Sequence, residues 1–507
     1  MTENGAGNAA KKADIDDAIL KIALSRGMFF PNSEIFGENI SGLWDYGPIG
    51  LKILNNIISE WRRIVDEIGG LEISGSVVLP RKVLRASGHE ENFFDVAVIC
   101  SNCRTAFRID KLLEEKEPSK NFEGLGDKEY LRLVAEYKIK CERCGGELST
   151  IRKFGTMFDV AVGLQDHQAS PEARETNAYL RPEACQSIFL DFKRIFTIYG
   201  KQLPLTLTQV GKAFRNELSP RNNLLRQREF YQNDIEIFFL DEDKFELLED
   251  ARIRIHDKGN RDVESIAISE ALKRGIIQNR VTAYGLSAVA KFMKDIGFDK
   301  DRVRYRKLYE DKAFYAKEAF DIEVKKGDEW VEICACNHRG DYDLASYERQ
   351  GGDVVKVDDR LPNIFEISAG TDRIFYLLLH DTFKSDPERT WFSLKGRIAP
   401  FRAAVFPLLS KEDLEGVAED IRSTSEYRSD VYYLSSGSIG KRYRKSDEIG
   451  VPLAFTVDYD TLEDGTLTVR DRETMLQFRA KKESVDAIIK DSESNDFEEL
   501  KKRYAAH

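Results

Sequence analysis

Arginines gather in one short segment of an otherwise acidic chain. The segment 211–230, GKAFRNELSPRNNLLRQREF, carries four of them: Arg215, Arg221, Arg226 and Arg228. The formal net charge of the chain is −11, so it needs no extra cations for solubility. The planar fork of an arginine matches two phosphate oxygens at once. We therefore expect a bound phosphate here, while an ion-pair cluster with Glu217 and Glu229 is the alternative for such a loop taken alone.

A second segment is also typical of an anion site. Residues 363–383, NIFEISAGTDRIFYLLLHDTF, read as a strand, a turn of small residues and an apolar helix with Arg373 at its start. A cation at a helix N-terminus opposes the helix dipole, which is unfavourable unless an anion lies there too. Two distant segments are thus each suited to face phosphate.

Cysteines form the third chemical signal. CSNC and CERC supply two closely spaced pairs: Cys100 and Cys103, then Cys141 and Cys144. Each pair can present two thiolates to one tetrahedral Zn²⁺, and Gly145 and Gly146 permit the tight turn that the second pair needs. The pattern predicts a closed, structural zinc site. Four unrelated thiols or two redox pairs are the alternative.

Composition limits the class of protein. A chain of 507 residues with 42% hydrophobic and 33% charged residues is expected to form two or three globular domains. We expect no membrane span and a cytoplasmic location, because we find no leader, no apolar run of about 18 residues and an odd number of cysteines. A pI of 5.4 excludes a general nucleic-acid coat but allows a locally basic face.

Hydrophobic periodicity predicts an α+β protein. A helix after Pro48 carries an apolar stripe of Leu51, Leu54, Ile58, Trp61, Val65 and Ile68. Residues 71–80 read as one strand, and apolar runs on both sides of the SPRNN turn read as a hairpin in a mainly antiparallel sheet with helices. Strands and helices alternate after residue 398, which is typical of a compact α/β domain.

We predict the following segments. They are a flexible N-terminus (1–20), a catalytic domain in three parts (21–99, 151–240 and 326–396), a zinc-binding insertion (100–150), a mainly helical insertion (241–325) and a C-terminal α/β domain (397–507).

Several of these strings, in this order, resemble a known family. FRNELSPRNNLLRQREF, SAGTDR and the Pro48 helix with VVLP are similar to motifs 2, 3 and 1 of class II aminoacyl-tRNA synthetases. SGHEENFFD, LRPEACQSIF and GSIGKRYRKSDEIGVP resemble the homodimeric glycyl-tRNA synthetases of class IIa in particular, and the likeness runs from about Arg26 to Arg479.

The resemblance implies a class II antiparallel sheet flanked by helices, and a reaction. Glycine would attack the α-phosphate of ATP, with Mg²⁺ bound to ATP, and the acyl group would then pass to tRNA. Arg215 would hold the α-phosphate and the glycine carboxylate, and Glu217 would contact adenine or ribose. Phe230 would stack on adenine, and Arg226 and Arg373 would clamp the triphosphate. Arg221 and Arg228 are expected to be solvated.

The resemblance also implies a glycine pocket. Its matching positions are Glu183, Asp234, Glu366 and Ser368 around the ammonium group, and Arg339 at the carboxylate. The family usually has Glu where Asp234 stands, and LRPEACQSIF, FEIS and ACNHR also depart from the family pattern. These departures affect the fine geometry of glycine selection.

The C-terminal domain would bind the anticodon. SIGKRYRKSDE gathers Lys441, Arg442, Arg444 and Lys445 around Tyr443, a pattern suited to phosphate contacts and base stacking, with a solvated charged face as the alternative.

The expected partners are glycine, ATP, glycine tRNA and a second copy of the chain, with motif 1 at the dimer interface. The alternatives are another class IIa synthetase, for threonine, proline, serine or histidine, and a catalytically inactive nucleic-acid-binding paralogue.

Overall fold

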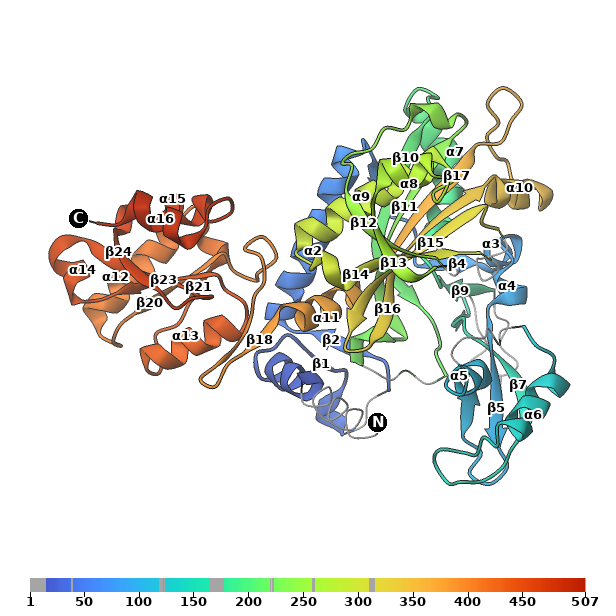
Figure 1. Cartoon of the computed structure of the whole chain (residues 1–507), viewed down its shortest axis with the longest axis horizontal. Coiled ribbons are helices and arrows are strands. Elements are labelled where there is room, and N and C mark those ends of the chain that lie inside the picture. The colour runs from blue at the N-terminus through green and yellow to red at the C-terminus, as the bar shows by residue number, and fades with distance from the viewer. Residues whose placement is uncertain are drawn as a thin grey trace.

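The computed structural model separates into a large central unit, a small unit beside it and a C-terminal unit (Figure 1). The residues that it describes are 15–37, 40–117, 122, 124–163, 177–218, 220, 223–257, 260–309 and 315–506, without the side chains of 260–263. No helix among these residues combines the length and the apolar character needed to cross a bilayer.

A nine-stranded sheet forms the centre of the large unit. Its order is β13-β12-β14-β15-β16-β17-β11-β10-β3, and only β10–β3 and β12–β14 pair in parallel. The strands are β3 (Leu71–Ile73), β10 (Leu205–Phe214), β11 (Glu229–Phe239), β12 (Arg252–Asp257), β13 (Asn260–Ala267), β14 (Val303–Leu308), β15 (Glu318–Lys326), β16 (Glu329–Gly340) and β17 (Asn363–Gly370). The predicted antiparallel sheet and its hairpin, β10–β11, are confirmed.

Helices cover both faces of this sheet. One face packs on α2 (Pro48–Glu67), α9 (Arg280–Ile296) and α11 (Thr371–Thr382), and the other packs on α7 (Cys185–Ile198) and α10 (Tyr342–Arg349). The helix α8 (Ile268–Lys273) leads into α9. Smaller elements complete the unit: β1 (Phe29–Pro31), β2 (Trp44–Tyr46), β4 (Val78–Pro80), α3 (Arg81–Ala86), α4 (His89–Asn92), β8 (Asp159–Val160), β9 (Ala178–Leu180), β18 (Phe383–Ser385) and β19 (Thr390–Phe392).

The apolar stripe of α2 lies inside its own chain. Pro48 occupies the first turn, where its fixed φ and missing N–H cost nothing. Trp61 is 2% exposed, packs edge-to-face on Phe292 of α9 and donates from Nε1 to Thr208 Oγ1 at 3.3 Å. Leu51 is 42% exposed. Because the core of the same chain buries most of the stripe, the stripe gives no support to the expected dimer interface.

The two-residue alternation of β11 separates apolar from polar side chains. Ile235, Ile237 and Phe239 join the large core under α2, α9 and α11. Asp234 and Glu236 face the opposite side, toward α7, and both are fully buried. One strand therefore contributes to the core and to a buried polar pocket.

The prediction that 241–325 is mainly helical is wrong. The segment contains α8 and α9, but it also contributes β12, β13, β14 and most of β15 to the central sheet. Apolar residues such as Ile253 and Ile255 alternate with arginines that lie at the surface. This two-residue period is the strand signal, and the many charged residues concealed it.

Two further expectations need correction. Residues 71–80 form two strands, β3 and β4, that belong to different sheets. The N-terminus was expected to be flexible to residue 20, yet residues 15–25 are helical and Ile19 is fully buried. Residues 1–14 lie outside the described part of the chain.

The small unit contains the predicted insertion. Its sheet, β6-β5-β7, and two helices enclose a separate apolar core. The elements are β5 (Phe94–Cys100), β6 (Ala106–Arg108), α5 (Ile109–Glu114), α6 (Asp127–Glu136) and β7 (Leu148–Gly155). The unit therefore begins before residue 100 and ends after residue 150.

The C-terminal unit is a five-stranded mixed sheet with helices, which confirms its α/β character. The order is β21-β20-β22-β23-β24, with parallel pairs around β20 and antiparallel pairs after β22. Its elements are β20 (Ala403–Pro407), α12 (Glu412–Thr424), β21 (Val431–Tyr433), α13 (Ile439–Glu448), β22 (Leu453–Val457), α14 (Tyr459–Asp464), β23 (Thr466–Asp471), β24 (Gln477–Lys481), α15 (Val485–Asp491) and α16 (Phe497–Tyr504).

Gly50 in α2 tests how tightly the motif 1 helix packs. A Cβ at this position would lie 1.9 Å from the Met28 carbonyl oxygen, which is backbone and cannot rotate away. We expect Gly50→Ala to destabilise the protein by about 3 kcal/mol. Gly416→Ala in α12 is the matched control: its Cβ meets nothing within 4 Å, and Ala should add up to about 1 kcal/mol of helix stability. Thermal denaturation measures both, and equal melting temperatures would contradict the close packing.

Candidate active site

The two predicted anion-binding segments converge on one cavity. Arg215 and Arg226, from the β10–β11 hairpin, line it together with Arg373, from α11. Phe230 and Glu217 line the same cavity. The guanidinium groups from distant parts of the sequence therefore face a common space, as the resemblance to class II synthetases implied.

Arg226 is paired in this site. Its Nε donates to Glu217 Oε2 at 2.6 Å, and Asp95 Oδ2 lies 3.8 Å from its Nη2. The side chain is 26% exposed, so the pair is partly shielded from water. Nη2 donates to the same oxygen, so the pair orients the guanidinium beside the cavity.

Arg215 lies between two aromatic rings. Its guanidinium carbon is 5.1 Å from the Phe93 ring centre and 5.5 Å from the Phe230 ring centre. Its Nη2 donates to Glu183 Oε1 at 3.2 Å, and its Nε donates to the Pro182 carbonyl at 3.1 Å. These contacts fix the direction of the guanidinium, which points from the hairpin toward Glu183.

Arg373 is held by backbone rather than by carboxylates. It donates to the carbonyls of Leu225 and Glu332, each at 3.1 Å. Its positive charge is therefore not neutralised by these contacts, which suits an anion-binding role at the start of α11.

Arg228 has a structural role instead of the expected solvated one. It donates to the carbonyls of Ser41 and Glu217, the second at 2.8 Å, and so ties the hairpin loop to residue 41. Arg221 lies outside the described residues.

Strand pairing assembles a buried cluster of acidic side chains, which we call the acidic pocket. Asp234 of β11 is opposite Ser368 of β17, and Glu236 is opposite Glu366. Asn337 of β16 is in turn opposite Glu366. Since directly paired residues point to the same face, three strands deliver polar side chains to one place.

Arg339 is clamped in this pocket. Its Nε and Nη2 donate to Asp343 at 2.7 and 2.8 Å, and its Nη1 donates to Glu366 Oε1 at 2.9 Å. The Tyr315 ring lies 4.0 Å from the guanidinium carbon. Burial would lower the pKa of Arg339, but Asp343 and Glu366 raise it well above its usual range. Arg339 is thus a fixed cation.

Glu183 is held ionised by cations on two sides. Burial alone would raise its pKa, but the charges of His89, Arg215 and Arg339 outweigh burial and hold the pKa well below its usual range. His89 Nε2 lies 3.2 Å from Glu183 Oε2, and Gln186 Nε2 donates to the same oxygen at 3.3 Å.

Asp234 and Glu236 differ from the other carboxylates. Within the described part of the chain, none of their four oxygens has a hydrogen-bond partner. Burial, reinforced by the nearby charge of Glu366, raises the pKa of Asp234 to about 8 and that of Glu236 well above its usual range. Glu366, by contrast, accepts from Arg339 and, at 2.8 Å, from Asn337.

Sequence reasoning missed several residues of this site. Glu236, His89, Asp343 and Tyr315 were not assigned. A signal existed only for Glu236, because it lies two residues after Asp234 in a strand and must share its face. The others reach the site from α4, α10 and the segment before β15.

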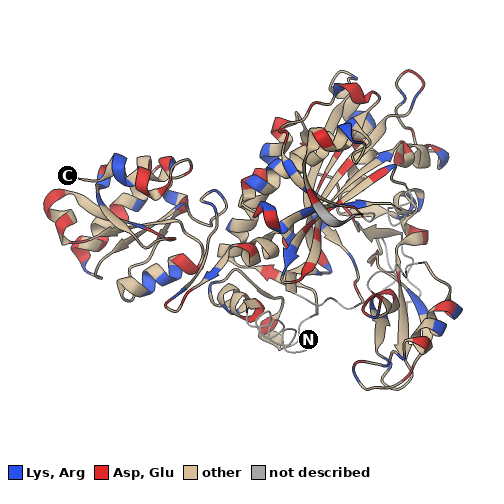
Figure 2. Cartoon of the chain, in the orientation of Figure 1, with Lys and Arg blue, Asp and Glu red and all other residues tan. Residues whose placement is uncertain are grey.

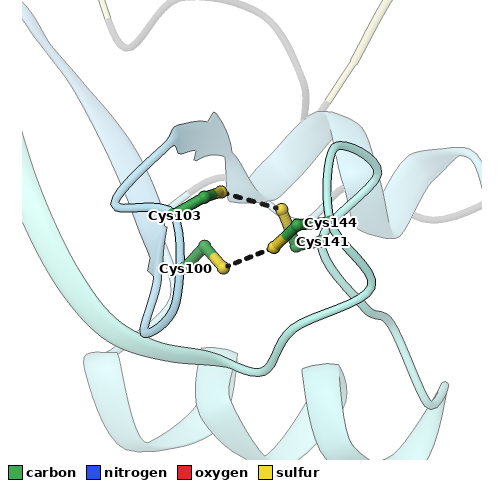
Figure 3. Close-up of side chains that lie close together, drawn as sticks. All are labelled: Cys100, Cys103, Cys141 and Cys144. Atoms are coloured by element: carbon green, nitrogen blue, oxygen red, sulfur yellow. Dashed lines mark hydrogen bonds between the residues drawn. The ribbon is translucent and has the colours of Figure 1, made fainter.

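The four predicted cysteines come together in the small unit, as Figure 3 shows. Cys100 and Cys144 Sγ lie 3.6 Å apart, and Cys103 and Cys141 Sγ lie 3.5 Å apart. These separations are far too long for a disulfide and close to the edge of a ZnS₄ tetrahedron with 2.3 Å bonds. Gly145 has a φ of +70°, as the predicted tight turn requires.

The basic run in α13 is divided by burial. Lys441 and Arg444 are exposed on the surface of the C-terminal unit, and Lys445 is half-buried. Figure 2 colours the lysines and arginines of this helix blue. Arg442 is 1% exposed and donates to the carbonyls of Pro407 and Gly437. Tyr443 packs against Phe406 and bonds Thr456. The assignment of Arg442 to tRNA contact is therefore wrong, because its side chain is buried, whereas that of Tyr443, whose ring is partly buried, stays a prediction.

Comparison with known proteins identifies the family. Residues 168–369 match the family described as tRNA synthetase class II core domain (G, H, P, S and T), and residues 402–492 match the family described as anticodon binding domain. The chain is 34% identical to a glycine–tRNA ligase of Methanocaldococcus jannaschii over 92% of this chain and 97% of the relative. It is 32% identical to one of Thermococcus gammatolerans over 95% and 99%, and 31% identical to one of Methanothermobacter thermautotrophicus over 92% and 97%. The chain therefore belongs to the glycine–tRNA ligase family of class II aminoacyl-tRNA synthetases.

Proposed function

We propose that this protein attaches glycine to tRNA through a glycyl-adenylate formed from ATP. The observation that carries the proposal is the position of Arg215. It lines the cavity shared with Arg226 and Arg373, which we call the arginine cavity, and it also donates to Glu183 of the acidic pocket. A nucleotide in the first and an amino acid in the second would place the α-phosphate beside the amino-acid carboxylate. Such positioning accounts for much of the rate of a phosphoryl displacement.

The arginines would handle the charge of ATP. Arg215 would neutralise the α-phosphate as the carboxylate attacks it, and Arg226 and Arg373 would hold the remaining phosphates. Arg226 would exchange Glu217 for phosphate, leaving Glu217 to accept from adenine or ribose beside Phe230. Mg²⁺ bound with ATP would share the neutralisation.

Glycine would be selected by charge and by lack of space. Arg339 keeps one N–H on each Nη beyond its bonds to Asp343 and Glu366, and these can meet the substrate carboxylate. Carboxylates around Asp234 would meet the ammonium group, with Ser368 at the entrance. A pocket so crowded with acids suits no larger or apolar side chain, which disfavours the other class IIa substrates. Retention of the three ATP-facing arginines disfavours an inactive paralogue.

The exposed part of α13 would contact tRNA. Lys441 and Arg444 are the exposed cations of that run, and Lys445 lies beside them. We also propose that the protein is a homodimer, as the family resemblance implies. This assembly rests on the resemblance alone.

The cysteine cluster would hold a structural zinc ion. The ligands would be Cys100, Cys103, Cys141 and Cys144, and four thiolates leave no open position for chemistry. The ion would stabilise the small unit, whose strand β5 ends at Cys100.

The first test is Arg215→Ala, assayed by glycine-dependent exchange of pyrophosphate into ATP. We expect at least a 100-fold loss, roughly the effect of removing one donor to a developing charge. Arg194→Ala, an exposed arginine of α7, is the control and should keep full exchange. Exchange that depends on another amino acid, or an unaffected Arg215 variant, would contradict the proposal.

The second test separates surface from buried cations in α13. The double variant Lys441→Ala, Arg444→Ala should weaken tRNA binding and reduce its salt dependence by about two units of slope, while pyrophosphate exchange is retained. Arg442→Ala should instead lower the melting temperature, because buried carbonyls lose their donor at a cost of about 1–3 kcal/mol each. If the double variant bound tRNA normally, this face would not be the interface.

The third test concerns zinc. Purified protein should contain about one Zn²⁺ per chain by atomic absorption, and Cys103→Ser should reduce this to near zero and increase proteolysis within 94–155. Cys336→Ala, a buried cysteine of the central sheet, should keep the metal. A metal-free wild-type protein purified without chelator would contradict a zinc site.

A further inference from the structure

Two buried carboxylates in the acidic pocket have no partner to stabilise their charge. Asp234 and Glu236 are each 0% exposed, and within the described residues their oxygens have no partner within hydrogen-bond distance and form no ion pair. The Ser368 hydroxyl lowers the pKa of Asp234, but burial and Glu366 outweigh it. Burying an ionised carboxylate without a partner is very unfavourable. The arrangement therefore indicates that these two carboxyl groups bind a cation, keep a proton, or do each at a different stage.

The other carboxylates of the pocket are already satisfied. Glu183 accepts from Arg215 and Gln186, and Glu366 accepts from Arg339 and Asn337. Glu183 and Glu366 therefore each have an arginine that already offsets their charge, so an ammonium ion would gain less by pairing with either of them. Asp234 and Glu236 can accept three N–H donors without replacing an arginine.

We infer that Asp234 and Glu236 together receive the substrate ammonium group, that the pair holds a proton while the pocket is empty, and that glycine displaces this proton to solvent. The inference rests on the proposed function and adds Glu236 to the residues that bind glycine. Glu366 then acts as a positioning residue that fixes Arg339. The step is a proton transfer alone: one carboxylic acid becomes a carboxylate as the ammonium group arrives.

The surroundings of the pair favour this exchange. The charged and titratable groups that face it are Arg181 and Glu183 before α7, Cys185 in α7, Arg339 in β16, Asp343 in α10 and Glu366 in β17. Arg339 is bonded to Asp343 and Glu366, and Arg181 donates to the Lys212 carbonyl at 2.7 Å. Neither cation pairs directly with Asp234 or Glu236, and the acids around them oppose further negative charge.

The position of the pair fits the path of the substrate. Ser368, directly opposite Asp234, lines the arginine cavity, so the ammonium end would pass Ser368 and reach Asp234 first. Glu236 lies two residues further along β11, on the same face of the sheet. Asp234 is one methylene shorter than the Glu usual in the family, and a second carboxylate beside it can complete the contact.

The direction of the pH dependence follows from the pKa of Asp234, which burial and Glu366 raise to about 8. Below pH 8 the pair keeps its proton, and glycine must displace it. Glycine should therefore bind more weakly as the pH falls. One displaced proton corresponds to about a tenfold change in affinity per pH unit.

The experiment measures the KM for glycine in pyrophosphate exchange between pH 6 and 8. For the wild-type protein we expect KM to fall by about tenfold per pH unit. For Asp234→Asn we expect a raised KM that changes less than about threefold over the whole range, because the carboxyl group whose pKa burial and Glu366 raise to about 8 is gone. For Glu236→Gln we expect a raised KM with the wild-type pH dependence, because burial and Glu366 still act on Asp234. Glu60→Gln, a buried carboxylate of α2 far from the pocket, should behave as wild type in its pH profile.

A second measurement detects the proton directly. Glycine added to the wild-type protein without ATP, in weakly buffered solution at pH 7 with an indicator, should release close to one proton per site, and Asp234→Asn should release far less. A wild-type KM independent of pH would overturn the proton displacement, and an unchanged KM in Glu236→Gln would remove Glu236 from the ammonium site. Absence of any glycine-dependent exchange would instead overturn the proposed function. If Asp234→Asn fails to fold, the wild-type pH profile and proton count still test the displacement.

Discussion

The antiparallel pairing of β11 with β10 on one side and β17 on the other is the constraint on which the site depends. It places Asp234 opposite Ser368 and Glu236 opposite Glu366. The same pairing brings the hairpin arginines to the start of α11, where Arg373 lies. Because each strand alternates its faces, the apolar residues between these polar ones hold the sheet against α2, α9 and α11. A one-residue slip would move every polar group of the pocket into that core.

Paired charges define the state of the site before substrates bind. Arg226 is bonded to Glu217, Arg215 to Glu183, and Arg339 to Asp343 and Glu366. Such pairs keep the guanidinium groups oriented, and a substrate gains only the difference between its own contacts and those that it replaces. Asp234 and Glu236 are the exception, since a proton rather than an arginine offsets their charge in our proposal. The ammonium group would thus pair with carboxylates without replacing an arginine.

The peripheral units show how local context changes the meaning of a motif. The CxxC pairs form a four-sulfur cluster in the geometry that their spacing predicted. The basic run of α13 does not act as a unit, because a helix turns successive residues to different sides. Lys441 and Arg444 are exposed, whereas Arg442 is buried and Tyr443 packs against Phe406.

The sequence by itself determined the antiparallel hairpin and the cysteine cluster, because residue type and local spacing carry these features. Its resemblance to class II synthetases implied the family and the convergence of Arg215, Arg226 and Arg373. It misjudged 241–325, where charged residues concealed strands, and it left Glu236 unassigned. Only the tertiary structure decided which carboxylates are already satisfied. Hydrogen-bond partners such as His89, Asn337 and Asp343 come from separate elements, so the protonation and availability of each acid depend on contacts that no local pattern records.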